Sequence, residues 1–209
     1  MIDIKSLTVR RSDAEVLRHL TLRIDPGHVV RIAGPNGSGK STLLNVLAGL
    51  HRPDEGDVLV DGHPAGDRAA RQRTGYLQEP HPLYDYLSVG EHIALAAGLW
   101  GRRSGDLADR ADRLGIGERR DQLAGHLSLG QRKKLGLVVA TAHDPALVLL
   151  DEPLNGLDDQ AVRQVRDMIG EWRLEGRTVV LTSHLVDPLA DVVDLTVHLD
   201  RPTPAVCGD

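Results

Sequence analysis

A strand signal that runs directly into a glycine-rich loop constrains this chain of 209 residues more than any other feature. The strand signal is the apolar run HVVRIAG at residues 28–34, and the loop is GPNGSGKS at residues 34–41. A nearly continuous apolar run is typical of a strand that is covered on both faces of a sheet. The loop fits G-x-x-x-x-G-K-[ST], and helical spacing follows from Lys40 to Leu50. This strand–loop–helix context predicts a phosphate-binding loop in an α/β core.

The loop supplies the kinds of atom that hold a phosphate group. Glycine permits positive φ and close approach of the backbone, and the N–H groups at the start of the helix then converge on phosphate oxygens. Lys40 adds a positive charge, and the Ser41 hydroxyl is a suitable magnesium ligand. The alternative is a glycine-rich turn that binds nothing, and the combination of glycines with Lys and Ser argues against it. The predicted phosphate-binding residues are Gly34, Pro35, Asn36, Gly37, Ser38, Gly39, Lys40, Ser41 and Thr42.

A second strand signal ends in two carboxylates. In ALVLLDEP, residues 146–153, an apolar run precedes Asp151 and Glu152. Ligands of open α/β sheets bind at the carboxyl ends of the strands. We therefore expect Asp151 to hold Mg²⁺ and Glu152 to orient or deprotonate an attacking water. Alone, such a pattern often marks a strand that ends at solvent, but together with the loop it predicts a nucleoside triphosphate hydrolase.

Strand and helix signals alternate over most of the chain. Strands are predicted at residues 2–9, 17–24, 28–34, 57–62, 73–78, 146–153, 177–183 and 194–199, and helices at residues 40–50, 158–175 and 185–192. Residues 88–124 have apolar residues at helical spacing only. Alternation of this kind indicates an α/β fold with a mainly parallel sheet. We predict one domain, residues 1–209, in which a P-loop core (1–78 and 141–209) with an N-terminal antiparallel β portion carries an inserted helical subdomain at about residues 79–140.

Composition excludes several classes of protein. The net charge of −5 does not favour a nucleic-acid surface, so no nucleic-acid partner is expected. The single cysteine, Cys207, allows no disulfide within the chain, which fits a reducing compartment. No apolar run approaches the roughly 18 residues of a membrane span. We therefore expect a cytoplasmic protein.

Five short motifs give the chain a family resemblance. GPNGSGKST, LSLGQ, LVLLDEP, NGLD and the His of TSH occur in the order and approximate spacing found in the ATP-binding subunits of ABC transporters. The chain resembles that family over nearly its whole length, and LSLGQ is the most specific of the motifs. The resemblance implies ATP and Mg²⁺ as cofactors and ATP hydrolysis that powers a membrane permease. As a short subunit with LYDYLSVGEH after Gln78, the chain is similar to exporter-type members.

The resemblance also implies a head-to-tail dimer with a second copy of the chain or a homologous ATPase subunit. Ser128, Gly130 and Gln131 of LSLGQ would then act on the nucleotide of the partner, and Asp158 of NGLD would lie at the interface. The alternative is that Ser128 and Asp158 only cap helices. Many members have Gly where this chain has Leu129, so that side chain must point away from the nucleotide.

Three further residues receive roles from the resemblance. Gln78 matches the glutamine that meets Mg²⁺ and the attacking water, and His184 matches a histidine that contacts the γ-phosphate. Many members stack adenine on an aromatic residue near the first hairpin, where this chain has Arg11, whose guanidinium plane can also stack on a base. The alternatives are a solvated Gln at a strand end, a capping His and a solvated Arg in a turn.

The predicted permease contact lies just after Gln78. Leu83, Tyr84, Tyr86 and Leu87 would form an apolar patch for a short cytoplasmic helix of the permease, which would hold the chain peripherally on the inner face of the membrane. Alternatively, these residues pack the helical insertion onto the core. Two other functions stay open: a soluble ABC-type ATPase that acts on nucleic acid or translation, and a P-loop regulator without a role in transport.

Overall fold

An antiparallel sheet forms the N-terminal part of the chain. The computed structural model describes residues 1–11, 14–183 and 187–200. The sheet contains β1 (Ile2–Arg11), β2 (Ala14–Ile24), β4 (Glu55–Val60) and β5 (His63–Pro64), in the order β2-β1-β4-β5. Asp61 and Gly62 join the last two strands with φ of 53° and 80°, and two positive φ values are what a tight hairpin turn requires.

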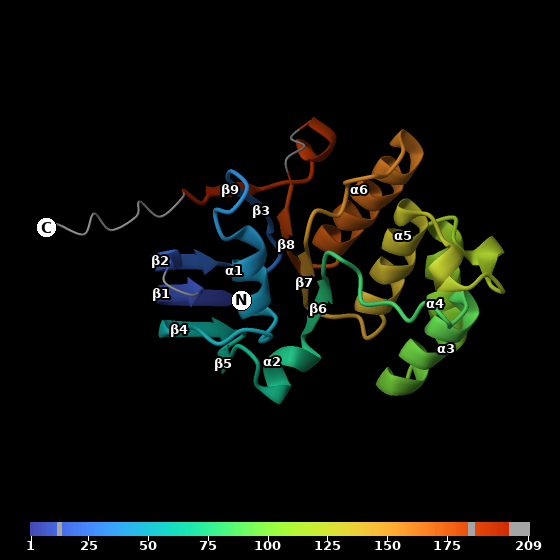
Figure 1. Cartoon of the computed structure of the whole chain (residues 1–209), viewed down its shortest axis with the longest axis horizontal. Coiled ribbons are helices and arrows are strands. Elements are labelled where there is room, and N and C mark those ends of the chain that lie inside the picture. Colours follow the sequence, from blue (N-terminus) through green and yellow to red (C-terminus); the bar gives the residue numbers. More distant parts are fainter. Residues whose placement is uncertain (12–13, 184–186, 201–209) are drawn as a thin grey trace, which may run out of the picture.

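A parallel sheet forms the centre of the molecule. Its strands are β3 (Val29–Ala33), β6 (Thr74–Leu77), β7 (Leu147–Leu150), β8 (Thr178–Thr182) and β9 (Leu195–His198), in the order β6-β7-β8-β3-β9. Each neighbouring pair of these strands runs parallel. Helix α1 (Lys40–Leu47) lies between the two sheets, and the short helix α2 (Arg68–Gln72) leads from the antiparallel sheet to β6 (Figure 1).

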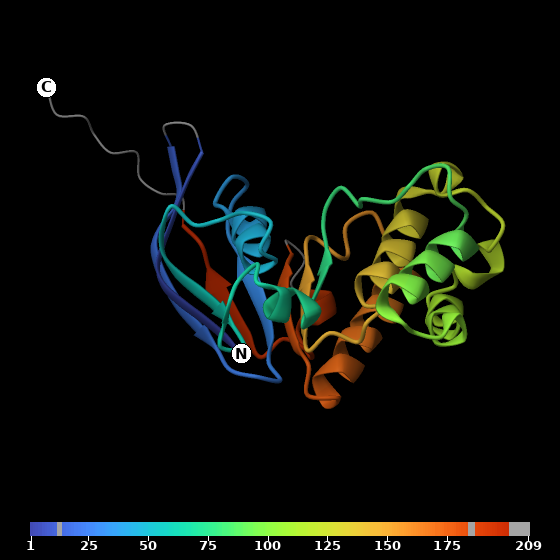
Figure 2. The ribbon, with the colours of Figure 1, turned by 90° about the horizontal axis from the view of Figure 1, so that it is seen from below.

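Helices cover the other face of the parallel sheet (Figure 2). They are α3 (Val89–Trp100), α4 (Ser104–Arg113), α5 (Leu129–Ala140) and α6 (Asp159–Leu174), with short 3₁₀ helices at η1 (Gly117–Arg119) and η2 (Ala124–His126). Helix α3 starts at a capping box, in which Ser88 Oγ accepts from the Glu91 N–H (3.2 Å) and Glu91 Oε2 accepts from the Ser88 N–H (2.7 Å).

Alternation along each parallel strand divides the core in two. Leu147 and Leu149 of β7 point into a cluster with α1 and the antiparallel sheet, whereas Val148 and Leu150 point into a cluster with the helices. Successive side chains of a strand face opposite sides. Both clusters therefore contain residues of the same strands. The helices after Gln78 pack on one face of the parallel sheet and form a single hydrophobic cluster with it. The combination of an antiparallel and a parallel sheet with helices confirms the predicted fold class.

The structure differs from the sequence prediction in short elements. The predicted helix at residues 185–192 is replaced, within the described part, by a 3₁₀ turn η3 (Asp187–Leu189). Proline disfavours the helical conformation of the residue that precedes it, so Pro188 weakens a helix that would start at residue 185. The two-residue strand β5 and the five-residue helix α2 were not predicted, because so few residues show no periodicity. Among the described residues, no helix is long and apolar enough to cross a membrane.

Candidate functional site

The phosphate loop between β3 and α1 has a backbone that only glycine can adopt at two positions. Gly34 has φ of 151°, and a Cβ there would lie 2.4 Å from the Leu199 carbonyl oxygen. Gly39, at the start of α1, has φ of 93°, and its Cβ would lie 2.7 Å from Leu17 Cδ2. The spacing of glycines in the sequence is thus explained by positive φ and by close packing of the loop.

Lys40 is held above this loop. Its Nζ donates to the carbonyl oxygens of Gly34 (2.9 Å) and Pro35 (3.1 Å), and the side chain is buried. The ammonium group therefore lies beside the N–H groups that open α1, where a phosphate group would meet both kinds of donor.

One cavity of about 660 Å³ gathers most of the residues predicted to bind phosphate. Glu152 comes to this cavity from the end of β7, so the loop and the predicted catalytic carboxylate face the same space. Arg11, exposed at the end of β1, lies at this cavity as well. The residues that line the cavity are Arg11, Val16, Asn36, Gly37, Gly39, Lys40, Ser41, Thr42, Glu152 and Asn155.

The carboxylate pair after β7 is fixed by a neighbouring strand. Thr182, fully buried at the end of β8, donates its hydroxyl to Asp151 Oδ1 (2.7 Å) and accepts from the Glu152 N–H (2.8 Å). Asp151 is itself buried, and its N–H donates to the Leu77 carbonyl oxygen (2.9 Å). A carboxylate fixed in this way and the Ser41 hydroxyl are oxygen ligands of the kind that Mg²⁺ prefers, so the donor set fits the predicted ion.

Most residues of LSLGQ and NGLD line a different cavity, of about 420 Å³, whereas Asn155 of NGLD lines the cavity of Lys40. The predicted partner-facing residues Ser128, Gly130, Gln131 and Asp158 all belong to it, and it also contains Gly115, Arg119, Leu129, Lys134, Gly156, Leu157 and Ala161. The two sets of predicted nucleotide-binding residues therefore face two separate spaces of the chain.

Ser128 and Asp158 both cap helices, which is the alternative role that the sequence left open. Ser128 Oγ accepts from the Gln131 N–H (3.3 Å), and Gln131 Oε1 accepts from the Ser128 N–H (2.9 Å), which is a capping box at the start of α5. Asp158 accepts from the Ala161 N–H (2.8 Å) at the start of α6. Leu129 is 54% exposed, and its Cδ2 lies 3.0 Å from the place of a Cβ on Gly156. Its side chain therefore leans toward the NGLD segment.

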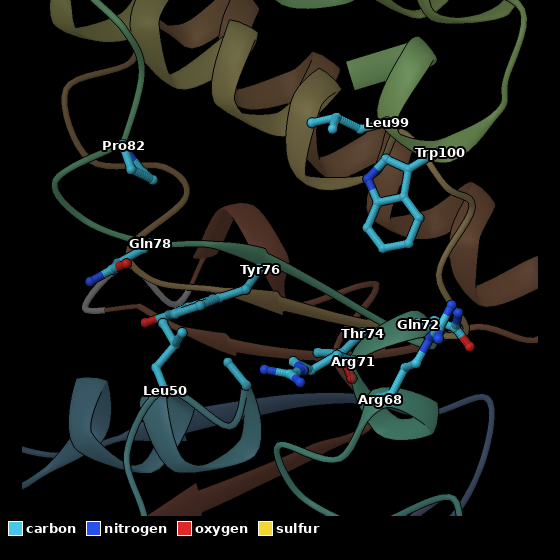
Figure 3. A pocket seen from close by; sticks show the side chains of 11 residues that line it. Leu50, Arg68, Arg71, Gln72, Thr74, Tyr76, Gln78, Pro82, Leu99 and Trp100 are labelled. Atoms are coloured by element: carbon cyan, nitrogen blue, oxygen red, sulfur yellow. The ribbon is translucent and has the colours of Figure 1, made fainter. Parts of the chain in front are cut away.

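Gln78 lies at a third cavity, of about 820 Å³, between the core and the helices (Figure 3). Figure 3 shows Leu99 and Trp100 on one side of this cavity and Arg68 and Arg71 on the other. Gln78 does not line the cavity of Lys40, and its predicted contact with Mg²⁺ stays a prediction. His184 lies outside the described residues.

Tyr76 lines the same third cavity. It donates its hydroxyl to Asn45 Oδ1 (3.1 Å), and burial together with the charge of Asp151 raises its pKa above the ordinary value. The phenol is therefore a hydrogen-bond donor at neutral pH.

The predicted permease patch divides into buried and exposed members. Leu83 packs against the core cluster of the helices, and Leu87 is half-buried. Tyr84 is 51% exposed and Tyr86 is 72% exposed, with their ring centroids 5.7 Å apart. The packing role that the sequence left open therefore applies to Leu83, and the two tyrosines form an aromatic surface.

Known proteins resemble the chain along most of its length. The family model described as ABC transporter matches residues 17–155. An uncharacterized ABC transporter ATP-binding protein of Nostoc sp. is 35% identical over 192 residues, which make up 88% of this chain and 57% of that protein. The chain thus spans little more than half the length of this relative. A lantibiotic transport ATP-binding protein of Streptococcus pyogenes is 28% identical over 194 residues, with coverage of 93% and 84%.

Solved structures give the same result. A dimeric bacterial ABC transporter cassette is similar with a TM-score of 0.83 at 26% identity, covering 96% of this chain and 94% of that chain. A post-hydrolysis dimer of the same cassette, bound to ADP and Pi, has a TM-score of 0.81 at 25% identity, with 97% of each chain covered.

The parallel sheet, the glycine-dependent loop before α1 and the fixed Asp-Glu pair define a P-loop nucleotide-binding domain. The family model matches well over half of the chain, and the chain belongs to the ABC transporter family. This confirms the resemblance stated from the sequence and the predicted class of ATP-binding, ATP-hydrolysing cassettes.

Proposed function

We propose that this chain binds and hydrolyses MgATP in a head-to-tail pair, with a second copy of itself or a homologous ATPase subunit, and so drives transport through a membrane permease. The observation that carries the proposal is the separation of the two predicted half-sites. The phosphate loop and Glu152 share one cavity, and Ser128, Gly130 and Gln131 share another. A two-fold pair of chains is the arrangement in which both half-sites contact the same nucleotide.

Each residue then has a defined task. The loop N–H groups and Lys40 bind the phosphate oxygens, and Arg11 contacts the base. Glu152 orients or deprotonates the attacking water, with Gln78 and His184 as the proposed partners in that step. Ser41 and Asp151 hold Mg²⁺, which when bound neutralises charge on the phosphate oxygens.

The partner chain completes the proposed site. The Ser128 hydroxyl and the N–H groups that open α5 offer donors to the γ-phosphate of the other subunit, and Asp158 lies at the interface. ATP closes the pair because its charge contacts both half-sites, and hydrolysis with release of phosphate loosens it.

Substitution of Glu152 tests this proposal. Glu152→Gln keeps the shape of the side chain but removes the base, so ATP turnover is expected to fall roughly 100-fold or more. Binding of ATP should persist, because Lys40 and the loop are unchanged. Light scattering with ATP should then show an accumulated dimer.

The control for this test is Glu175→Gln, at the exposed end of α6. It should hydrolyse ATP like the wild type and should not accumulate the dimer. A Glu152→Gln chain with wild-type turnover would remove Glu152 from its role, and a wild-type chain without turnover would remove the proposed function.

The proposed permease contact lies over the two exposed tyrosines, Tyr84 and Tyr86. They follow Gln78 and Pro82 closely in the chain, and these two residues line the third cavity. A cytoplasmic helix of the permease at this place would hold the chain on the inner face of the membrane. We include export as the direction, because LYDYLSVGEH at residues 83–92 resembles exporter-type members.

Membrane association in the native host tests the contact. The double substitution Tyr84→Ala and Tyr86→Ala should lower the fraction of the chain that sediments with membranes, while ATP binding stays unchanged. Leu174→Ala with Leu195→Ala is the matched control, since both leucines are exposed on other elements. An unchanged membrane fraction in the tyrosine variant would contradict the proposed contact.

A further inference from the structure

Lys133 is a charged side chain in the interior of the molecule. It lies on α5, in the basic run that follows LSLGQ, and is 1% exposed. A buried ammonium group is costly unless it is paired and hydrogen-bonded. Its surroundings meet this condition, because Nζ contacts the Glu152 carbonyl oxygen (2.7 Å), the Asn155 carbonyl oxygen (2.8 Å) and Glu79 Oε2 (3.2 Å). Three acceptors match the three donors of an ammonium group.

These contacts join three segments that the proposed function uses. Glu152 and Asn155 lie in the loop after β7 and line the cavity of Lys40. Glu79 directly follows Gln78, and α5 itself begins at Ser128. One ammonium group thus connects the proposed catalytic loop, the Gln78 segment and the helix that would contact the nucleotide of the partner.

The backbone of Glu152 explains why such a contact is needed. Its φ is 46°, in the left-handed region that side chains other than glycine rarely adopt. A conformation of this kind costs about 1–3 kcal/mol and persists only where the surroundings fix it. Thr182 Oγ1 holds the N–H of Glu152 (2.8 Å), and Lys133 Nζ holds its carbonyl oxygen (2.7 Å). The two peptide groups that flank Glu152 are therefore fixed by side chains from β8 and α5.

Close packing of α5 against β6 brings Lys133 near the Gln78 segment. Gly136, one turn further along α5, allows the helix to approach β6, since a Cβ there would lie 2.8 Å from Leu77 Cδ1. His81 fills the space beside it: Nδ1 lies 2.7 Å from the Gln78 carbonyl oxygen, and Nε2 lies 3.5 Å from Glu79 Oε2. The Gln78 segment is therefore connected to α5 through His81, Glu79 and Lys133.

We propose that Lys133 is a positioning residue for ATP hydrolysis, which holds Glu152 in its left-handed conformation and couples it to the Gln78 segment through Glu79. This inference rests on the proposed function, because it assumes that Glu152 acts on the attacking water. Lys133 contacts no part of the phosphate loop, so it affects the rate of hydrolysis and leaves the binding of ATP unchanged.

Lys133→Met tests the inference in the purified chain with MgATP. The substitution keeps the length of the side chain but removes its donors, so kcat should fall roughly 10- to 100-fold as Glu152 loses its position. The dissociation constant for ATP should stay within about twofold of the wild type, because the loop is a separate site. The control Lys5→Met removes an exposed lysine on β1 and should leave both quantities unchanged.

Glu79→Gln gives a second test that does not disturb the core, since the Glu79 side chain is 36% exposed. It should lower kcat about threefold or more, because the contact with Lys133 loses its charge. In Lys133→Met the same substitution should have no further effect, since Glu79 acts through Lys133. If Lys133→Met does not fold, Glu79→Gln alone decides.

The outcomes separate this inference from the function on which it rests. A wild-type chain without ATP hydrolysis would remove the proposed function. Wild-type hydrolysis with unchanged kcat in Lys133→Met, or in Glu79→Gln where the first variant does not fold, would overturn the inference alone. Losses of kcat that add in the double variant would also overturn the inference. A folded Lys133→Met chain that no longer binds ATP would overturn it as well.

Discussion

At the scale of single residues, Thr182 joins the two carboxylates of the candidate site. Its hydroxyl donates to Asp151 and accepts from the Glu152 N–H. Thr182→Val keeps the shape but leaves a carboxylate oxygen and a buried N–H without this partner, so we predict a loss of about 2 kcal/mol in the free energy of unfolding. Because Asp151 is a proposed Mg²⁺ ligand, ATP turnover should fall roughly 10- to 100-fold. Urea unfolding and a phosphate-release assay measure the two effects.

Thr178 provides the matched control on the same strand. It is fully buried, and its hydroxyl accepts from the Gly27 N–H (3.0 Å) at the other end of β8. Thr178→Val should cost about 1 kcal/mol of stability and leave ATP turnover unchanged. Equal losses of turnover in the two variants would show that Thr182 acts only through general stability.

The sequence predicts the residues that would touch a nucleotide better than the residues that hold them. Lys40, Asp151 and Glu152 stand in motifs whose spacing follows from the loop and from the strand end. Thr182 belongs to the TSH motif, but the resemblance gives a role only to its His. The positions of Thr182 and Lys133 in the sequence do not show what these residues hold, because their partners include backbone N–H and carbonyl groups. The basic run RKK at residues 132–134 gives no sign in the sequence that Lys133 is buried, and only the fold shows it.

At the scale of elements, prediction from sequence depends on whether one side-chain property repeats along the element. The strand β7 is apolar at every position because it is covered on both faces, so its pattern predicted it. The helix α5 buries Lys133 and Gly136 beside leucines, and this mixture breaks the apolar period. The packing of α5 onto β6 was therefore not predictable from its own residues.

Asp144 joins four segments by charge. It accepts from Arg110 of α4 (2.7 Å) and lies within 3.3 Å of Arg102 and 3.5 Å of Arg177, just before β8. Burial alone would raise the pKa of Asp144, but the hydrogen bond from Arg110 and the nearby guanidinium charges outweigh it and lower the pKa below 3.8. The folded state therefore holds this carboxylate ionised to a lower pH than the unfolded chain does.

Asp144→Asn tests this link between elements. Asn tolerates the left-handed backbone of residue 144 (φ 53°), so the substitution removes the charge with little strain. Because the side chain is 37% exposed, we predict a loss of only about 1 kcal/mol in the free energy of unfolding at pH 7.

The pH dependence gives the sign of the effect. The stabilisation is complete above the ordinary pKa of 3.8 and is lost as pH falls through the lower folded value. Urea unfolding at a series of pH values should therefore show the difference between wild type and variant shrinking in acid. Asp57→Asn, at an exposed position of β4, should show no such difference. A difference that grows in acid would contradict the assigned shift in the pKa of Asp144.

At the scale of the whole molecule, the proposed pair of chains explains why one domain has two segments that are predicted to bind nucleotide. The phosphate loop and the start of α5 lie at separate cavities, which the order of motifs alone did not establish. Within one chain the two segments would each form half of a site. Mixing two inactive variants can test whether two chains complete it.

The two variants damage different half-sites. Lys40→Ala removes the cation of the phosphate loop and leaves α5 intact. Leu129→Glu adds a negative charge at the start of α5, which has no acidic residue in its first turn. That charge favours the helix by about 0.3–1 kcal/mol but repels a phosphate group. Leu129→Gln introduces a side chain of the same size as Glu but without its charge, so it shows the effect of the change in shape alone.

Each variant alone should fail to hydrolyse ATP, because every site in its dimer contains one damaged half. In an equal mixture, random pairing makes half of the dimers mixed, and each mixed dimer has one site with an intact loop and an intact α5. ATP turnover should then recover to about a quarter of the wild-type value. The recovery should grow with total protein concentration, since it requires association. If both half-sites served the nucleotide of their own chain, the mixture would stay inactive at every concentration.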